Sequence, residues 1–167
     1  IAEIRELGIG NRGIVSQRPT PKSQLTMIDV GCGSGILSVA ALKLGVEKAL
    51  GVDVAEASVK SARENAAVNG IGEAFIVAQG SVDEILAGDF EFTSAPLVAA
   101  NILAPILIRL MEAGLGALVS PGGRLILSGI LEEKEADIRA AAASHHLKII
   151  ERRQMGDWVA FTLIPNS

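Results

Sequence analysis

Three glycines that follow a short apolar run constrain this chain more than any other feature. The run 27–30 leads into Gly31-Cys32-Gly33-Ser34-Gly35, and an amphipathic segment follows at once. This order predicts a β-strand, a Gly-rich turn and a helix start, because glycines permit positive φ and leave bare backbone for a ligand. A second apolar run, 49–52, ends at Asp53, whose carboxylate can accept hydrogen bonds from both hydroxyls of a ribose. Together the two runs predict a nucleoside-binding βαβ unit.

The glycine spacing distinguishes between the nucleosides that such a turn can bind. A dinucleotide fingerprint has glycines at its first, third and sixth positions, but the sixth position here is Ile36. A pyrophosphate at the helix start would meet that side chain, whereas S-adenosylmethionine has no phosphates. Asp29 adds a carboxylate near the turn, which suits an ammonium group and repels a phosphate. We therefore favour S-adenosylmethionine, and a nicotinamide cofactor stays open as the alternative.

The composition fits one cytoplasmic domain. The chain has 167 residues, of which 49% are hydrophobic but only 3% aromatic, so its core is expected to consist of Ala, Val, Ile and Leu. Strands covered on both faces by helices use that set of residues. A net charge of −4 argues against a broad nucleic-acid-binding face, and no run approaches the roughly 18 apolar residues of a membrane span. The single cysteine, Cys32, cannot form an internal disulfide, which favours the cytoplasm.

Alternating strand and helix patterns begin at residue 26. Residues 1–25 show no clear period and are expected to form a poorly defined N-terminal segment, with one domain over 26–167. The expected strands are 26–30, 49–52, 74–78, 97–100, 124–128, 148–154 and 158–164. The expected helices with defined ranges are 34–44, 55–69, 82–87 and 132–144. A further helix is expected after the fourth strand, with Pro105 in its first turn and with Ile106, Leu107, Leu110 and Met111 on its buried face. Residues 120–123 read as a turn.

The last two strands are separated by only three residues, so they are expected to form an antiparallel hairpin. The predicted fold class is α/β, with a doubly wound, mostly parallel seven-stranded sheet that ends in this hairpin. In such sheets ligands bind beyond the carboxyl ends of the strands, next to the first strand. Gly31, Asp53, Gly80, Ser81 and Asn101 all fall at those ends. We therefore expect them to share one site.

Longer stretches of the sequence resemble a known family. They read MIDVGCGSGILSVAALKLG, GVDVAEASVKSARENAAVNG, AANILAP, SPGGRLILSGILEE and DWVAF, and they cover roughly residues 26–163. The chain resembles the catalytic domain of the ribosomal protein L-11 methyltransferase (PrmA) family, within the Rossmann-like class I S-adenosylmethionine-dependent methyltransferases. The resemblance implies N-methylation of protein amines, either lysine side chains or an N-terminal amine. It also implies ribosomal protein L-11 as the partner. Methyl transfer from a sulfonium is an in-line displacement that needs no metal, so no metal site is expected.

The expected site combines the Gly-rich turn with the strand ends. The resemblance puts the turn around the methionine moiety and Gly80-Ser81 near the adenine. The expected cofactor-binding residues are Asp29, Gly31, Cys32, Gly33, Asp53, Val54, Gly80, Ser81 and Asn101. Asn101 is also the expected catalytic residue, because its carbonyl can orient an amine nucleophile against the methyl group.

Structural readings stay open for several of these residues. Asp29 could be a buried structural carboxylate, and Asp53 could cap the following helix. Cys32 could be a small packing residue, because nothing nearby pairs it with a histidine. Gly80-Ser81 could be a turn with a helix cap, and Asn101 could satisfy local backbone.

The sequence departs from the family pattern ahead of residue 26. The family carries a Gly-Thr-Gly-Thr-His segment there that helps to close the cofactor pocket, whereas this chain reads IGNRGIVSQRPTPKSQ. Full-length members also carry a separate substrate-capturing domain, so we expect this chain to correspond to the catalytic domain alone. A non-catalytic S-adenosylmethionine-binding module therefore stays open. A nicotinamide-dependent oxidoreductase is disfavoured, since the chain has no Tyr for a Tyr/Lys pair.

Overall fold

The structure, a computed structural model, describes residues 25–166. Its strands are β1 (Thr26–Val30), β2 (Lys48–Asp53), β3 (Phe75–Gln79), β4 (Ala95–Asn101), β5 (Val119–Leu131), β6 (Leu147–Met155) and β7 (Trp158–Pro165). Its α-helices are α1 (Ile36–Lys43), α2 (Glu56–Val68), α3 (Val82–Ala87), α4 (Ala104–Glu112) and α5 (Glu135–Ser144). Two short 3₁₀ helices, η1 (Leu115–Leu118) and η2 (Glu132–Lys134), precede β5 and α5.

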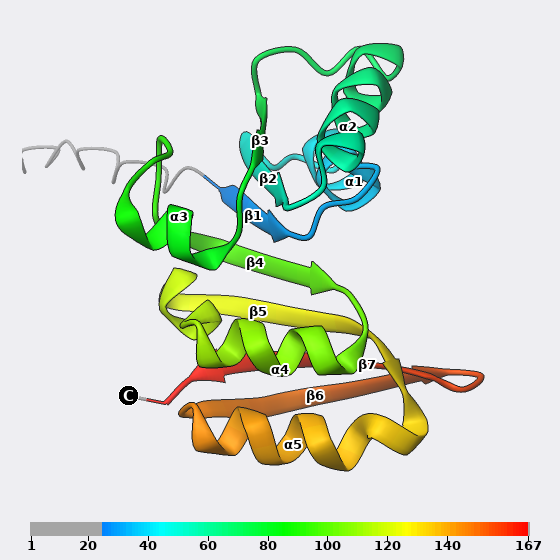
Figure 1. Ribbon diagram of the computed structural model, residues 1–167, viewed down its shortest axis with the longest axis vertical. Helices are drawn as coiled ribbons and strands as arrows, with labels where there is room; N and C mark the ends of the chain where they lie inside the picture. Colours follow the sequence, from blue (N-terminus) through cyan, green and yellow to red (C-terminus); the bar gives the residue numbers. More distant parts are fainter. Residues whose placement is uncertain (1–24, 167) are drawn as a thin grey trace, which may run out of the picture.

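The seven strands form one sheet in the order β3-β2-β1-β4-β5-β7-β6 (Figure 1). Neighbours from β3 to β5 are parallel, while β7 runs antiparallel to both β5 and β6. This confirms the doubly wound, mostly parallel sheet with a C-terminal hairpin. The chain reverses its winding direction between β1 and β4, so the carboxyl end of β1 lies at the point where such folds bind ligands.

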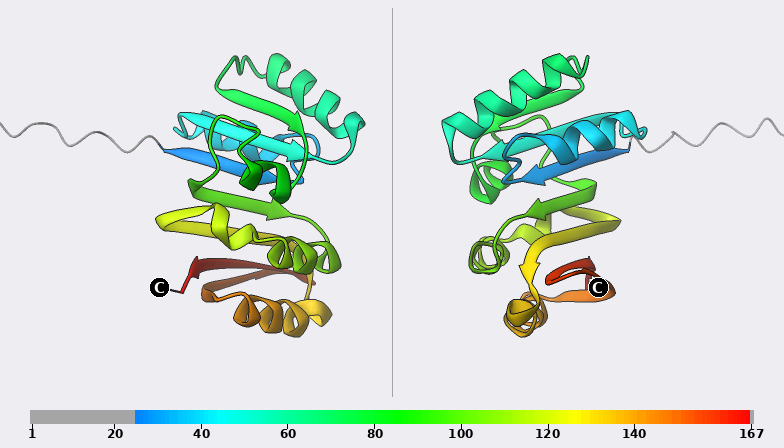
Figure 2. Two further views of the ribbon diagram at one scale, coloured as in Figure 1. Left: turned by 60° about the vertical axis from the view of Figure 1, so that its left-hand side comes forward. Right: turned by 90° about the vertical axis from the view of Figure 1, so that its right-hand side faces the viewer.

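Helices cover both faces of the sheet and divide the core in two. On one face, α1 and α2 pack on β1, β2 and β3 through residues such as Val39, Val59 and Ala62. On the other face, α3, α4 and α5 pack on the strands through residues such as Leu107 and Ile138. Figure 2 shows the same stack of strands from two further sides, with α4 and α5 along its lower half. Among residues 25–166, no helix is both long and apolar enough to cross a membrane.

Most predicted boundaries lie within one or two residues of the observed ones, but β5 is a correction. Residues 120–123, predicted as a turn, lie inside β5, which is much longer than expected. The reason is pairing on either side of them, because Val119 pairs with Ala95 and Arg124 pairs with Leu97. The four residues between form an irregular excursion in which Gly122 has a φ of 77°.

A second correction concerns the buried face of α4. Leu107, Leu110 and Met111 are buried as predicted, but Ile106 is 41% exposed. Ile106 is not part of the core; its side chain lines a cavity at the carboxyl edge of the sheet. A helical period marks apolar positions without showing what each of them faces.

Candidate functional site

The turn between β1 and α1 is held against the end of β2. The backbone N–H groups of Gly31 and Cys32 both donate to the carbonyl of Val52, at 2.8 and 2.9 Å. Gly31, Gly33 and Gly35 have φ angles of 70°, 54° and 74°, in the left-handed region that favours glycine. The turn thus uses three glycines in the left-handed region and is joined to the end of β2 by two backbone hydrogen bonds.

Asp53, at the end of β2, ties this turn to the start of α2. Its Oδ2 accepts a hydrogen bond from the N–H of Gly33 at 3.0 Å, and its Oδ1 accepts one from the N–H of Ala55 at 2.9 Å. Ala55 is the N-cap of α2, so Asp53 is not the helix cap that the sequence left open. An ionised carboxylate offers about four acceptor sites, so two backbone bonds leave capacity for ligand hydroxyls.

The side chains of Asp29 and Cys32 are buried and are not exposed at the carboxyl edge of the sheet. The Asp29 side chain is buried and points under α1, where its Oδ2 accepts a hydrogen bond from the Ser38 hydroxyl at 2.8 Å. Burial raises the pKa of Asp29 to about 6, against the lowering effect of the Ser38 hydrogen bond. Cys32 is a buried packing residue, and burial raises the pKa of its thiol to about 12, so it stays protonated.

Gly80 and Ser81 combine a turn with a helix start. The N–H of Gly80 donates to the Asp53 carbonyl at 3.1 Å, and Ser81 is the N-cap of α3. The Ser81 N–H donates to the Glu84 carboxylate at 2.8 Å. The structural role left open for this pair is therefore present, and both residues also face the cavity described next.

A cavity of about 380 Å³ lies at the carboxyl ends of β1, β2, β3 and β4. Six of the nine predicted site residues line it, namely Gly31, Asp53, Val54, Gly80, Ser81 and Asn101. Val30, Ile102, Ile106 and Leu110 complete the lining. Asp29, Cys32 and Gly33 are not part of the lining. We call this space the nucleoside cavity, because Asp53 lies in its wall and its size suits a small organic ligand.

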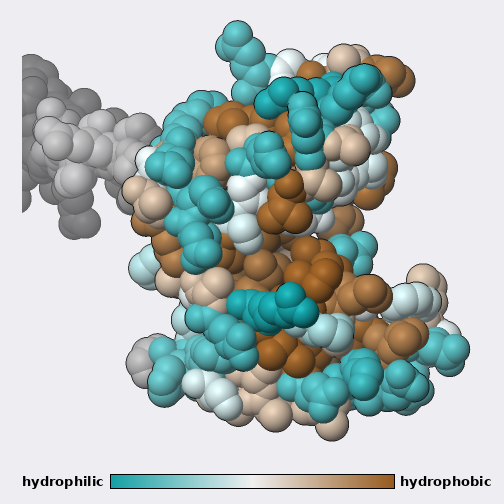
Figure 3. Space-filling view, in the orientation of Figure 1, coloured by the Kyte–Doolittle hydropathy of each residue, from teal (hydrophilic) through white to brown (hydrophobic). Residues whose placement is uncertain are grey.

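A second cavity, of about 830 Å³, lies beside the first and extends to the β6–β7 hairpin. It is lined by Asn101, Ile102, Leu103, Ile106, Ser128, Gly129, Arg153, Gln154, Met155, Trp158, Val159 and Ala160. We call it the hairpin cavity. In the space-filling view of Figure 3, hydrophobic side chains gather near the middle of the face, around the level of β4 and α4. Sequence reasoning missed most of this lining, although Leu103, Met155 and Trp158 are large apolar residues with 58%, 82% and 49% of their surface exposed.

Asn101 lies where the two cavities meet. It ends β4, pairs in register with Ser128 of β5, and is one of three residues that line both cavities. A Cβ atom on Gly129 would lie 2.9 Å from the Asn101 Oδ1 atom. A side chain at position 129 would therefore displace the Asn101 carbonyl, and glycine does not. Gly129 has a φ of 77° and supports the site, but nothing adjacent to it in the sequence indicates this contact.

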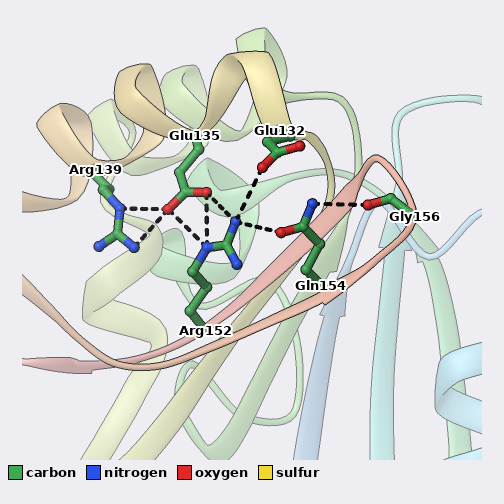
Figure 4. A network of polar contacts seen from close by, with 6 residues as sticks. All are labelled: Glu132, Glu135, Arg139, Arg152, Gln154 and Gly156. Carbon is green, nitrogen blue, oxygen red and sulfur yellow. Dashed lines mark hydrogen bonds and ion pairs between the residues drawn. The ribbon is translucent and has the colours of Figure 1, made fainter.

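An ion-pair network fixes the elements beneath the hairpin. Glu135 on α5 pairs with Arg152 of β6 at 2.7 Å and with Arg139, one helical turn along α5, at 2.7 Å (Figure 4). Arg152 also donates to Gln154, whose amide donates to the Gly156 carbonyl at the hairpin tip. The hydrogen bonds that Glu135 accepts from Arg152 and Arg139 hold its pKa at about 2, well below its usual value.

Comparison with known proteins places this geometry in a family. The chain is similar to the ribosomal protein L11 methyltransferase of Halalkalibacterium halodurans, with 39% identity over 81% of this chain and 41% of that protein. It is similar to the Azotobacter vinelandii protein of the same name, with 45% identity over 70% of this chain and 37% of that one. The chain thus spans about two fifths of the length of these relatives.

Solved structures agree with the sequence comparisons. A ribosomal protein L11 methylase from Lactobacillus delbrueckii subsp. bulgaricus has 35% identity and a TM-score of 0.74, over 88% of this chain and 72% of that one. Streptococcus pneumoniae Sp1610, solved in complex with S-adenosyl-L-methionine, shares the fold at 23% identity and a TM-score of 0.68, over 84% of this chain and 66% of that one. The family model for ribosomal protein L11 methyltransferase (PrmA) matches residues 15–164. The chain therefore belongs to the ribosomal protein L11 methyltransferase (PrmA) family.

Proposed function

We propose that this chain is the catalytic domain of an S-adenosylmethionine-dependent N-methyltransferase that acts on amines of ribosomal protein L11. The observation that carries the proposal is the position of Asn101, at the junction of a nucleoside cavity and a larger apolar cavity. Methyl transfer requires two ligands that meet at one point, and the two cavities meet there. The names of the relatives support ribosomal protein L11 as the substrate.

The nucleoside cavity suits S-adenosylmethionine. Asp53 has acceptor capacity for ribose hydroxyls, and Gly80 and Ser81 lie across the cavity, where we assign the adenine. The methionine end of the cofactor is assigned to Gly31. Asp29 then supports the site indirectly, because its hydrogen bond with Ser38 joins β1 to α1 beneath the Gly-rich turn. Ile36, 62% exposed at the start of α1, stands where a dinucleotide fold has its third glycine, so the nicotinamide alternative is disfavoured.

The hairpin cavity suits the aliphatic part of an amine-bearing side chain. Leu103, Ile106 and Trp158 supply apolar surface, and Asn101 supplies a carbonyl that accepts a hydrogen bond from an amine N–H. When bound, S-adenosylmethionine supplies an activated methyl group, so the residues need only align the amine with it. Such alignment can lower the barrier by about 7–11 kcal/mol in favourable cases.

The amine has to lose a proton before it can attack, because a lysine amine is mostly protonated at neutral pH. Within residues 25–166, the lining of the hairpin cavity contains no carboxylate and no histidine. We therefore assign proton loss to water, with Asn101 holding the neutral amine. The proposal places the protein in the cytoplasm with its ribosomal substrate.

Two measurements test the proposal. Calorimetry with S-adenosylhomocysteine and, separately, NAD distinguishes the cofactor classes, and we expect binding of the first only. A methylation assay with labelled S-adenosylmethionine and purified ribosomal protein L11 then tests transfer. We expect transfer to be efficient only when the N-terminal part of a full-length relative is fused ahead of this chain, because the chain spans about two fifths of such a relative. Binding without transfer in that fusion would favour the non-catalytic S-adenosylmethionine-binding module.

A further inference from the structure

Ile102 forms part of the wall between the two cavities. It follows Asn101 directly and lines both the nucleoside cavity and the hairpin cavity. Its side chain is half-buried, in contrast to the exposed side chains of its neighbours Asn101 and Leu103. A ligand in either cavity therefore contacts the same aliphatic side chain from its own side.

The Ile102 side chain covers Gly31 of the Gly-rich turn. A Cβ atom on Gly31 would lie 2.9 Å from Ile102 Cγ1 and would collide with Ile102 Cδ1. The space that a side chain at position 31 would fill is therefore taken by Ile102. The apolar surface of the nucleoside cavity next to Gly31 is supplied by Ile102, the residue that follows β4, and not by the turn itself.

The backbone of Ile102 has little freedom to move. Its N–H donates to the Ser128 carbonyl at 3.2 Å, and α4 begins two residues later. A Cβ atom on Gly129 would lie 3.1 Å from the Ile102 nitrogen and 3.0 Å from its oxygen, so β5 packs directly on this peptide. Any response of Ile102 to a ligand is therefore confined to the rotation of its side chain.

We propose that Ile102 is a positioning residue that couples the two cavities. A cofactor seated against Gly31 restricts the rotamers of Ile102, and this reshapes the wall that the incoming amine meets. The coupling is reciprocal, because a free energy that links two binding sites acts in both directions. The inference rests on the proposed function and adds to it that cofactor occupancy prepares the acceptor site.

Trp158 provides a direct readout of this coupling. It is the single tryptophan of the chain, and it lines the hairpin cavity but not the nucleoside cavity. We expect saturating S-adenosylhomocysteine to shift the Trp158 emission of the wild-type chain. In Ile102→Ala the ligand should still bind, within about tenfold of the wild-type affinity by calorimetry, but the emission shift should be lost. Ile102→Val, which keeps a branched side chain, should retain most of the shift.

Two aliphatic controls each line only one cavity. Leu103 lines the hairpin cavity alone, and Val54 lines the nucleoside cavity alone. Leu103→Ala should keep the shift, and Val54→Ala should keep it at higher ligand concentration. A direct effect of the ligand on the Trp158 indole would be present in all four variants. It therefore cannot explain a shift that is lost only in Ile102→Ala.

The outcomes separate the coupling from the proposed function. If calorimetry shows no binding of S-adenosylhomocysteine to the wild-type chain, the proposed function fails and the coupling fails with it. If the ligand binds but the wild-type emission does not change, only the coupling is overturned. An unchanged shift in Ile102→Ala would also overturn it, because the signal would then bypass this side chain.

Discussion

At the scale of single residues, the site depends on side chains that are oriented before any ligand arrives. Both oxygens of Asp53 already accept backbone hydrogen bonds, from Gly33 and from Ala55. These bonds hold the carboxylate in the wall of the nucleoside cavity. Under the proposed function, the carboxylate would lose little conformational freedom on binding a ribose.

Replacing Asp53 with Ala should weaken the binding of S-adenosylhomocysteine by about 1.5–3 kcal/mol, the range for hydrogen bonds to a charged group. The core should remain intact, because Asp53 is only partly buried at a strand end. Calorimetry measures the affinity, and circular dichroism of the same sample confirms that the variant is folded. An unchanged dissociation constant in a folded variant would refute the ribose assignment.

Asn101→Ala should lower kcat for methylation of ribosomal protein L11 by at least about tenfold, with cofactor affinity within a few fold of wild type. This pattern marks an interaction made mainly in the transition state. Ser128→Ala, the neighbouring polar residue in register on β5, serves as the matched control and should affect kcat much less. Equal losses of cofactor affinity and kcat would assign Asn101 to the nucleoside cavity alone.

Asp29 makes stability depend on pH. Its folded-state pKa is raised from 3.8 to about 6, so its favourable contribution is present below pH 3.8 and is lost as the pH rises to 6. Asp29→Asn removes the buried charge, so the variant should gain stability relative to wild type across that interval, by up to about 3 kcal/mol. Urea unfolding between pH 4 and pH 7 measures this difference. A difference that stays flat across this range for Asp29→Asn would contradict the cause assigned to the shift.

Sequence patterns revealed only part of the site, and the physical reason is visible in individual residues. Glycines and strand-end carboxylates leave a local signature, so Gly31 and Asp53 could be predicted. Two contacts left no such signature: Ile102 covers Gly31, and Gly129 lies close to Asn101. Both depend on how the ends of β1, β4 and β5 meet, which no local pattern encodes. The direction of Asp29 was likewise open, because a strand end can point to either face of a sheet.

At the scale of elements, the Glu135 network joins α5 to β6 behind the hairpin cavity. Glu135 forms ion pairs with Arg152 and Arg139, and the hydrogen bonds from these two arginines lower its pKa to about 2. A depressed carboxyl pKa gives stability that is present above the unfolded value of 4.5 and is lost as the pH falls to 2. The network therefore stabilises the α5–β6 unit at neutral pH, and salt weakens it because the groups are near the surface.

Glu135→Gln should lower the free energy of unfolding at pH 7, and the difference from wild type should shrink steadily toward pH 2. Thermal unfolding across this range measures it, with Glu133→Gln as the control, because Glu133 forms no ion pair with any other residue of the described range 25–166. Added salt should reduce the effect of Glu135→Gln at pH 7. A difference that persists unchanged at pH 2 would mean that packing, not charge, links α5 to β6.

Element boundaries show where local sequence signals are sufficient. The stop of α2 at Asn69-Gly70 was predicted correctly, because Gly70 adopts a left-handed φ of 69° right after the helix. Residues 120–123 have an equally strong turn composition, yet β5 continues through them. There the pairing of β5 with β4 on both sides overrides the local preference. Tertiary pairing of this kind cannot be inferred from a single segment.

At the scale of the whole molecule, the nucleoside cavity joins the two halves of the sheet. Gly31, Asp53 and Gly80 come from the β1-β2-β3 half, whereas Asn101 and Ile102 come from the half that begins with β4. The seam between the halves is short, since β1 pairs with β4 in register over only three residue pairs. A ligand in this cavity therefore contacts both sides of the seam.

A bound nucleoside should consequently stabilise both halves equally. At a free concentration of 100 times its dissociation constant, S-adenosylhomocysteine should raise the free energy of unfolding by about 2.7 kcal/mol. Hydrogen exchange should show this increase for the slowest amides of both β2 and β5, because those amides exchange only when the whole domain unfolds. NAD at the same concentration should leave both strands unchanged, and Asp53→Ala should require more ligand for the same protection. If protection rose in β2 but not in β5, the halves would unfold separately, and the cavity would not act as the link between them.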